Sequence, residues 1–70
     1  MERKRLTSSQ IRSVGYDPSS QILEIEFPSG SIMQYSRVSA EVHRRLMAAP
    51  SPGSFFQDRI EDEFTARRIR

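Results

Sequence analysis

Apolar and polar side chains alternate most clearly in residues 21–36, QILEIEFPSGSIMQYS. Leu23, Ile25 and Phe27 are separated by glutamates, which is the period-two pattern of a strand with one dry face and one solvated face. Residues 28–30, Pro-Ser-Gly, follow with turn chemistry, because Pro suits the first central position of a type I turn and Gly accepts a left-handed conformation. The stretch predicts a β-hairpin closed by a three-residue loop.

The same alternation predicts the register of this hairpin. Pairing across the loop joins three pairs of residues: Phe27 with Ser31, Ile25 with Met33 and Leu23 with Tyr35. Both strands then agree on which face is apolar, and a slip of one residue would turn the apolar side chains of one strand to the solvent.

Another strand is predicted before the hairpin, over residues 11–16, because β-branched and aromatic residues gather there. Residues 17–20, Asp-Pro-Ser-Ser, form a turn cluster. Pairing across this cluster places Val14 opposite Leu23, with Tyr16 on the same apolar face. The three strands then form an antiparallel meander.

The register of this first strand stays open at the level of the sequence. Gly15 is a position at which the strand could bulge. A bulge there would bring Ile11 onto the apolar face instead.

Two amphipathic helices are predicted to follow. Ser39 is a good N-cap for the first helix. Its apolar stripe consists of Val42, Leu46 and Ala49. Pro50 should end the helix, because the residue before a proline disfavours helical geometry.

The second helix has two candidate N-caps, Ser51 and Ser54, and after Ser51 the ring of Pro52 would occupy the first helical position. Its apolar stripe recurs at every fourth residue: Phe56, Ile60 and Phe64. The helix is predicted to fray among residues 67–70.

Together these elements predict an α+β fold with the order β-β-β-α-α, in which two helices cover one face of a three-stranded antiparallel meander. Residues 10–66 would form a single domain. A polar lead-in over residues 1–9 would precede it, and a basic C-terminal tail over residues 67–70 would follow it.

The length and composition of the chain narrow its class. Seventy residues bury a small core, so dimerisation or a docking partner is a realistic expectation. The absence of cysteine excludes disulfides, thiolate metal sites and cysteine nucleophiles. No apolar run approaches membrane-spanning length, and residues 1–9 lack the hydrophobic stretch of a secretory signal. These features predict a cytoplasmic protein that does not bind membranes.

Charge is nearly balanced, with 11 basic and 9 acidic side chains and a net charge of +2. The basic residues, however, gather near both ends of the chain and in its middle: Arg3, Lys4, Arg5 and Arg12; Arg37, Arg44 and Arg45; Arg67, Arg68 and Arg70. Such segregation predicts a local positive patch.

Groups for catalysis are scarce. His43 is the only histidine in the sequence, and no acid or nucleophile is placed to partner it, so we interpret it as a surface or partly packed residue. Glu24 and Glu26 lie two apart on one strand face, and a solvated polar face is favoured there over a paired-carboxylate site. We predict that the protein is not an enzyme and uses no metal, cofactor or small-molecule substrate.

Nucleic-acid binding is the better functional hypothesis, because single-stranded RNA is usually held by exposed aromatic rings flanked by Arg or Lys. For Tyr35 the alternative is a tyrosine at the rim of the core, since it shares the face of Leu23. The candidate RNA-binding residues are Arg12, Tyr16, Tyr35, Arg37, Arg44, Arg45 and Phe55.

Four motifs occur along the chain: SS-x-I-x-SVGYD at residues 8–17, LEIEF-x-x-G at 23–30, M-Q-Y at 33–35 and A-x-S-x-G-x-FF at 49–56. In their order and spacing they resemble the KTSC domain family. That family is named for a module at the C-terminus of some lysyl-tRNA synthetases, and it also occurs as small stand-alone bacterial proteins. The resemblance implies RNA, and tRNA in particular, as the expected ligand.

The chain departs from the family's central Tyr-x-Tyr motif, because Met33 stands at the first tyrosine position while Tyr35 keeps the second. Whether these two positions stack on bases or pack in the core stays open. The chain also has Ser39 where the family tends to begin its first helix with Pro. Four further positions match the family motifs without an assigned role: Ser8, Ser9, Ser51 and Gly53.

The sequence therefore predicts a small non-enzymatic module that binds RNA through Arg clusters and exposed aromatic rings. The alternative is a protein-interaction or self-association module. A three-stranded meander leaves unpaired backbone on its first and third strands, and such an edge can pair with another chain or a second copy.

Overall fold

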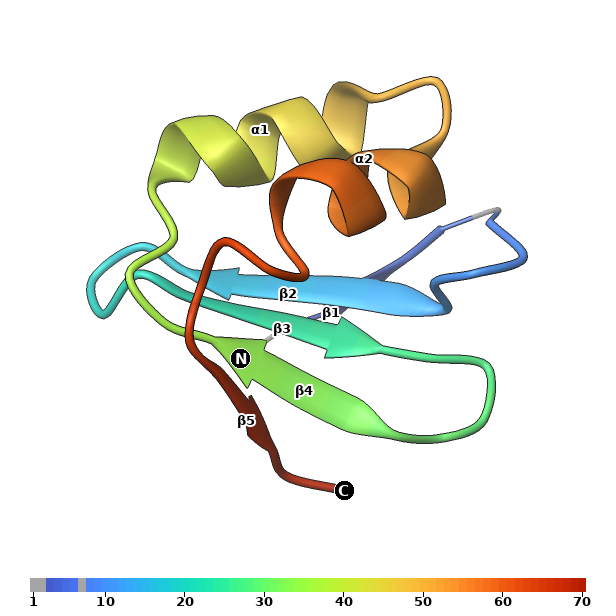
Figure 1. Ribbon diagram of the computed structural model, residues 1–70, viewed down its shortest axis with the longest axis horizontal. Coiled ribbons are helices and arrows are strands. Elements are labelled where there is room, and N and C mark those ends of the chain that lie inside the picture. The colour runs from blue at the N-terminus through green and yellow to red at the C-terminus, as the bar shows by residue number, and fades with distance from the viewer. Residues whose placement is uncertain (1–2, 7) are drawn as a thin grey trace.

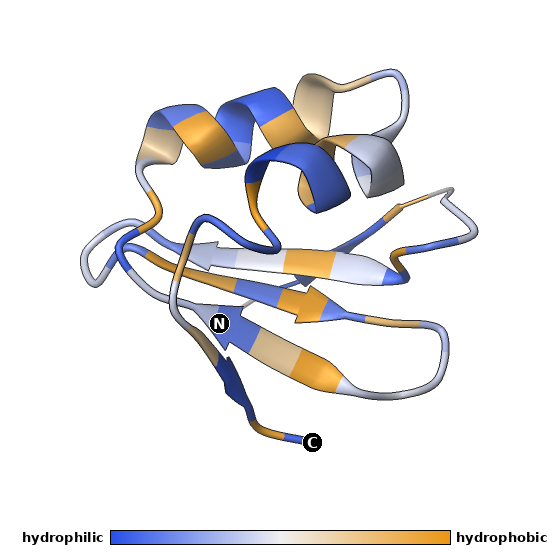
Figure 2. Ribbon diagram, in the orientation of Figure 1, coloured by the Kyte–Doolittle hydropathy of each residue, from blue (hydrophilic) through white to orange (hydrophobic). Residues whose placement is uncertain are grey.

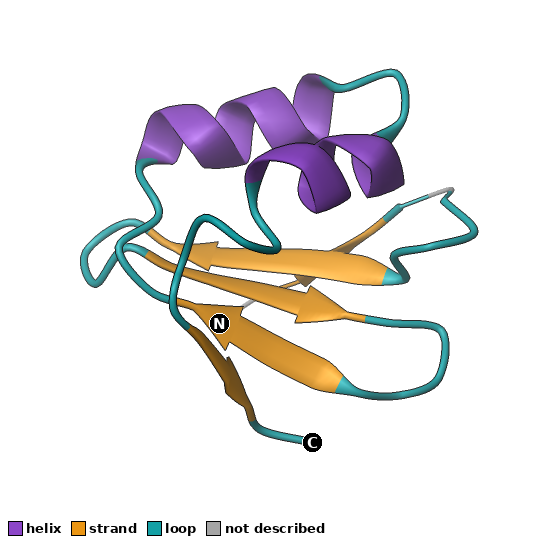
Figure 3. Ribbon diagram, in the orientation of Figure 1, coloured by secondary structure: helices purple, strands orange, loops and turns teal. Residues whose placement is uncertain are grey.

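The computed structural model describes residues 3–6 and 8–70. Within them the chain forms five strands and two helices (Figure 1): β1 (Arg3–Arg5), β2 (Ser13–Asp17), β3 (Ile22–Glu26), β4 (Ile32–Tyr35), α1 (Ala40–Ala48), α2 (Pro52–Arg59) and β5 (Ala66–Arg68). The strands form one antiparallel sheet in the order β1-β2-β3-β4-β5. Both helices lie in a layer over one face of this sheet (Figure 3), as the α+β prediction required.

The prediction of three strands is wrong, because two further strands flank the meander. β1 lies inside the predicted polar lead-in, and β5 overlaps the predicted basic tail. Their sequences, RKR and ARR, carry no apolar alternation. Both form through backbone pairing with the exposed edges of β2 and β4, which is a property of the neighbouring strand rather than of their own side chains.

The predicted hairpin and its register are confirmed. Ile25 pairs with Met33, and Leu23 pairs with Tyr35. The loop over residues 28–30 closes with a hydrogen bond of 2.9 Å from the Gly30 amide to the Phe27 carbonyl. Gly30 has φ of 95°, the left-handed conformation that its lack of a side chain permits.

The register predicted between the first two strands of the meander is wrong by two residues. Val14 pairs with Ile25 rather than Leu23, and Tyr16 pairs with Leu23. The turn begins one residue later than expected, since Asp17 still belongs to β2 and its carboxylate accepts the Ser19 amide at 3.1 Å. A shift of two residues keeps the same face apolar.

The two alternatives for the start of this strand are also resolved. Pairing runs without interruption through Gly15, so the strand has no bulge there. Ile11 is nevertheless fully buried, because it enters the core from the segment just before β2.

Helix α1 begins and ends as predicted. The Ser39 hydroxyl accepts the Val42 amide at 3.3 Å, and Ala49 has the extended ψ of 138° that precedes Pro50. Leu46, the centre of the predicted stripe, is fully buried.

Helix α2 begins with Ser51 as its N-cap and Pro52 in the first turn, but the prediction that it runs to residues 67–70 is wrong. It ends at Arg59, and the amides of Ile60 and Glu61 both reach the Phe56 carbonyl at 2.9 Å. Phe64 continued the helical spacing in the sequence. In the structure it packs against the core from the turn that leads into β5.

The core lies between the helices and one face of the sheet. Figure 2 shows hydrophobic bands on β2, β3 and β4 beneath the helices, whereas β5 is hydrophilic. The buried cluster contains residues from every layer: Ile11, Val14, Leu23, Ile25, Tyr35, Val38, Leu46, Phe56 and Ile60. In the described part of the chain, neither helix is long and apolar enough to cross a bilayer.

Candidate nucleic-acid interface

The sheet face opposite the helices, which we call the open face, carries charged residues in two cross-strand rows. The pairing register gives the first row, from β1 to β5, as Arg3, Gly15, Glu24, Gln34 and Arg67. It gives the second row as Arg5, Ser13, Glu26 and Ile32. Each row has a carboxylate on the central strand β3 and an arginine on the edge strand β1.

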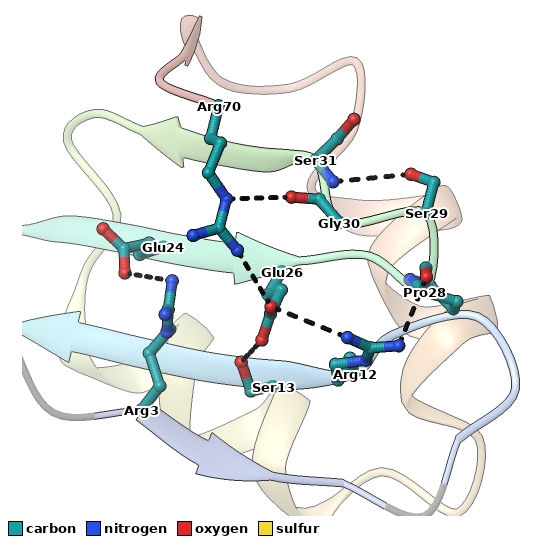
Figure 4. A network of polar contacts seen from close by, with 10 residues as sticks. All are labelled: Arg3, Arg12, Ser13, Glu24, Glu26, Pro28, Ser29, Gly30, Ser31 and Arg70. Carbon is teal, nitrogen blue, oxygen red and sulfur yellow. Dashed lines mark hydrogen bonds and ion pairs between the residues drawn. The ribbon is translucent and has the colours of Figure 1, made fainter.

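Glu24 is 8% exposed and is the more buried of the two carboxylates. It accepts a hydrogen bond of 2.9 Å from Nη1 of Arg3 and one of 3.0 Å from Nε2 of Gln34 (Figure 4 shows the Arg3 contact). Both partners are its neighbours in the first row. The two donors satisfy both oxygen atoms of a carboxylate that water barely reaches, which offsets the cost of burying it.

Glu26 is held from three sides (Figure 4). Ser13 donates its hydroxyl to the carboxylate at 2.8 Å, Nη2 of Arg70 donates at 3.3 Å, and Nη1 of Arg12 lies 4.0 Å away. The Ser13 hydrogen bond, followed by the positive charges of Arg3, Arg12 and Arg70, lowers the pKa of Glu26 although burial opposes the shift. The carboxylate is therefore ionised at neutral pH.

Two arginines also attach the β3–β4 loop to this network. Nε of Arg70 donates to the Gly30 carbonyl at 3.2 Å, and Nη2 of Arg12 donates to the Pro28 carbonyl at 3.4 Å (Figure 4). The C-terminal end of the described chain thus lies against the hairpin loop. Arginines from segments far apart in the sequence meet around Glu26.

The edges of the open face are its most positive parts. Arg5 on β1 and Arg67 on β5 are both exposed. Within residues 3–6 and 8–70, no carboxylate lies within ion-pair distance of either guanidinium. Of the sequence candidates, only Arg12 belongs to this face. For the other arginines of the open face, the sequence offered one signal, the clusters of basic residues near both ends of the chain. Nothing in the sequence indicated that both ends join one sheet.

The structure places the other predicted arginines elsewhere. Arg44 and Arg45 lie on the exposed side of α1 and both bind Glu41, at 3.2 Å from Nε of Arg44 and 2.9 Å from Nε of Arg45. These contacts lower the pKa of the Glu41 carboxyl, with the Arg44 hydrogen bond as the largest cause. Arg37 is exposed in the connection before α1, with φ of 61°. The structure does not bring these three arginines to the open face.

Tyr35 belongs to the core, which resolves the alternative left open by the sequence. It is 3% exposed, and its ring meets that of Phe56 edge-to-face with centroids 5.4 Å apart. Burial, and secondarily the charge of Glu61, raises the pKa of its hydroxyl. Neither ring face is open to a base. Met33 also packs against the core, half-buried, and fills its position as an adaptable apolar side chain.

Tyr16 is half-buried, unlike Tyr35. Its hydroxyl donates to the Val38 carbonyl at 2.5 Å, and its ring stacks on the His43 imidazole at 4.6 Å with 10° between the planes. The stacked pair lines a pocket of about 540 Å³ between α1 and the β1–β2 edge of the sheet, together with Lys4 and Met47. Burial lowers the pKa of His43, which favours the neutral imidazole.

Phe55 is half-buried and packs against the core from α2. It lines a second, smaller hollow of about 340 Å³ between the helices, whose rim carries charges of both signs, including Arg59 and Asp58. Its lining residues belong to α1, α2 and the turn that follows α2, so the hollow lies in the helical layer.

The motif positions without a predicted role lie in two segments, and Gly53 of one approaches Gln10 of the other. The Gln10 side chain lies so close to Gly53 that a β-carbon there would stand 2.8 Å from Cβ of Gln10. The Ser8 hydroxyl accepts the Gln10 amide at 3.1 Å, and Ser51 donates to the Ser54 hydroxyl at 3.1 Å. Gly53 therefore lets the segment before β2 lie against the start of α2, whereas the Ser8 and Ser51 hydrogen bonds are local to each segment. Ser9 is exposed in the same segment.

A metal site finds no support in the residues that the structure describes, since no three His, Cys, Asp or Glu side chains cluster there. Glu24 and Glu26 are engaged by arginines instead. The arrangement can bind anions at its edges and accept hydrogen bonds at its centre.

Comparisons with known proteins agree with this architecture. The KTSC domain model matches residues 7–64. An uncharacterised protein of Stutzerimonas stutzeri is 50% identical over 56 residues, which cover 80% of this chain and 79% of that protein. A lysine–tRNA ligase of Nostoc is 41% identical over 61 residues, which cover 87% of this chain and 11% of the ligase. The crystal structure of a KTSC domain protein from Yersinia pestis matches with a TM-score of 0.95 and 39% identity, covering 99% of this chain and 97% of that one.

Proposed function

Since the chain belongs to the KTSC domain family, we propose that it is a non-enzymatic RNA-binding module whose open face receives the RNA. The observation that carries the proposal is the placement of arginines along both edges of this face, on β1 and β5. Guanidinium groups bind phosphate oxygens through two parallel hydrogen bonds, so each edge offers contacts to an RNA backbone.

The acidic centre of the open face fits a backbone that runs along its edges. Glu24 and Glu26 on β3 repel phosphates, so the phosphates are expected over β1 and β5. Carboxylate oxygens over the centre can accept hydrogen bonds from ribose 2′-hydroxyl groups, which distinguish RNA from DNA. This division of charge is the reason that we place the RNA on the open face rather than on Arg44 and Arg45.

Transfer RNA is the first ligand to test. The Nostoc ligase that shares this segment is named for lysine and tRNA, and the matched segment is a small part of it. A domain of this size attached to such an enzyme is well placed to add nonspecific affinity for the same RNA.

Fluorescence anisotropy of labelled tRNA and of a short single-stranded RNA, at low and at physiological salt, tests the proposal. The informative variant replaces Arg5 and Arg67 together with Ala, since these residues lie at opposite edges of the open face. Loss of two phosphate contacts should make the binding constant less sensitive to salt. The negative slope of its logarithm against the logarithm of the salt concentration should become shallower by about 1.5. The matched control replaces Arg44 and Arg45 on α1 and should leave the slope unchanged. Equal effects of the two double variants would contradict an interface on the open face.

The alternative, self-association through a sheet edge, meets an obstacle in the edge strands themselves. β1 and β5 are three residues long and carry mostly Arg and Lys. Short, positively charged edge strands disfavour pairing with a second copy. We therefore expect a monomer in sedimentation experiments over a concentration series, and a concentration-dependent dimer would revive the alternative.

A further inference from the structure

We propose that the pocket beside the Tyr16–His43 stack binds one unpaired nucleotide of the RNA, with the base against the aromatic pair and its phosphate near Lys4. This inference rests on the proposed RNA-binding function and names a second contact for the same ligand. The pocket is lined by Arg3, Lys4, Val14, Tyr16, His43 and Met47.

The pocket and the open face share one strand. Arg3 and Arg5 lie in the rows of the open face, whereas Lys4 pairs with Val14 and therefore lies on the side of β1 that faces the helices. An RNA backbone that follows the β1 edge thus passes between both sets of cations. A base that leaves the backbone toward the helices would enter the pocket.

The size of the pocket fits such a ligand. Its volume of about 540 Å³ lies within the range of small-molecule sites. Val14 and Met47 supply an apolar surface, and Lys4 supplies a positive charge at the edge of the sheet. A nucleotide combines a flat, weakly polar base with an anionic phosphate, which matches this division of the lining.

The aromatic pair is held in place for stacking. The Tyr16 hydroxyl is anchored by the Val38 carbonyl at 2.5 Å, so the ring cannot turn freely. His43 is parallel to Tyr16 within 10°. A base that adds to a pre-formed stack gains the stacking energy without the entropy cost of ordering the rings.

Two other parts of the structure fit a nucleotide less well than this pocket. The hollow beside Phe55 is smaller and mixes Arg45 and Arg59 with Asp58 and Glu63, so its lining favours no anion. The carboxylates of the open face are already paired with arginines. The stacked pair with a nearby lysine is the arrangement that best combines stacking with a positive charge.

NMR titration of the full chain with adenosine 5′-monophosphate tests this inference. We expect saturable shifts of the Met47 methyl and the His43 ring resonances. Met33, which does not line the pocket, provides an internal reference in the same spectrum. Uridine 5′-monophosphate should bind more weakly because its base stacks less well, and inorganic phosphate alone should leave Met47 unshifted.

Two variants and one control sharpen the result. Lys4→Ala should weaken adenosine 5′-monophosphate about five-fold through loss of one exposed charge contact. His43→Ala should weaken it about ten-fold through loss of the stack. Arg44→Ala, on the exposed side of α1, should have no effect.

The outcomes separate this inference from the proposed function. Binding of tRNA that persists while adenosine 5′-monophosphate leaves Met47 and His43 unshifted would overturn the pocket and keep the RNA-binding function. Nucleotide binding by a protein that binds neither tRNA nor single-stranded RNA would overturn both, since the pocket would then serve a free nucleotide. An equal response to inorganic phosphate would overturn the role of the base.

Discussion

The two faces of the sheet are formed by alternate residues of the same strands, but different parts of the chain pack against each face. On β3, Leu23 and Ile25 lie beneath the helices and are fully buried, whereas Glu24 and Glu26 lie on the open face. The helix side is completed by α1 and α2, whose apolar stripes are visible in the sequence. The open face is completed by arginines from the edge strands and the chain end, which show no periodic pattern.

This difference separates stability from binding. Apolar contacts on the helix side are buried and close-packed, so a change there costs folding free energy. Arginines at the edges of the open face, such as Arg5 and Arg67, are exposed, so a change there alters stability little but changes the field that an anion meets.

Leu46→Ala should destabilise the fold by about 2–5 kcal/mol, because a fully buried leucine leaves a cavity between α1 and the sheet. Arg67→Ala on the open face should change the free energy of unfolding by less than about 0.5 kcal/mol. Urea denaturation of both variants measures the difference. Comparable destabilisation would show that the two faces do not differ as described.

Gly53→Ala should destabilise by about 1–3 kcal/mol, since the new methyl group overlaps the Gln10 side chain. Gln10→Gly removes the overlapping atoms, so the double variant should be more stable than the sum of the two single changes predicts. A double-mutant cycle by thermal or urea unfolding measures this coupling. Strictly additive effects would mean that the two segments do not depend on each other.

Glu26→Gln should strengthen tRNA binding about three-fold, because it removes a negative charge from the open face but keeps a hydrogen-bond acceptor for Ser13. Glu41→Gln on α1 removes the same charge from the helix side. Anisotropy titrations should show no gain for that control. A similar gain in both variants would indicate that net charge alone governs binding.

The pH dependence of stability should show a small contribution from His43. Its pKa is lowered by burial, so the unfolded chain takes up a proton more readily than the folded one. The stabilisation is complete above the ordinary value of 6.5 and is lost as the pH falls below it. Tyr16, Lys4 and Arg3 line the same pocket as His43.

His43→Gln provides the control for that measurement. Thermal unfolding of the variant should be flat through the same pH window. The carboxyl groups with lowered pKa, those of Asp17, Glu26 and Glu41, lose their stabilisation only as the pH falls below their ordinary values of 3.8 and 4.5. If the stability of the wild-type protein did not change with pH between 6.5 and 4.5, the burial of His43 would be contradicted.

The sequence was sufficient where local chemistry decides the structure. The β3–β4 register follows from alternation and from Gly30, and α1 follows from Ser39 and Pro50. These signals act over a few residues, so no knowledge of distant contacts was needed.

The pairing of strands far apart in the sequence could not be predicted from the pattern of apolar and polar residues. β1 and β5 exist because β2 and β4 offer unpaired backbone, and backbone hydrogen bonds have no signature in side chains. The same limit applied to the site. Arg12 was identified, whereas Tyr35 was expected among the exposed aromatic rings as one of two alternatives and is buried. The Tyr16–His43 stack joins β2 and α1, which no local pattern links.

Amide NMR mapping, with unlabelled tRNA added to the labelled protein, tests whether RNA binds on the open face. We predict shifts along β1 and β5, at Glu24 and Glu26 and at Tyr16, with little change on the exposed side of α1. Shifts confined to the segment around Arg44 and Arg45, with the open face unaffected, would contradict the account.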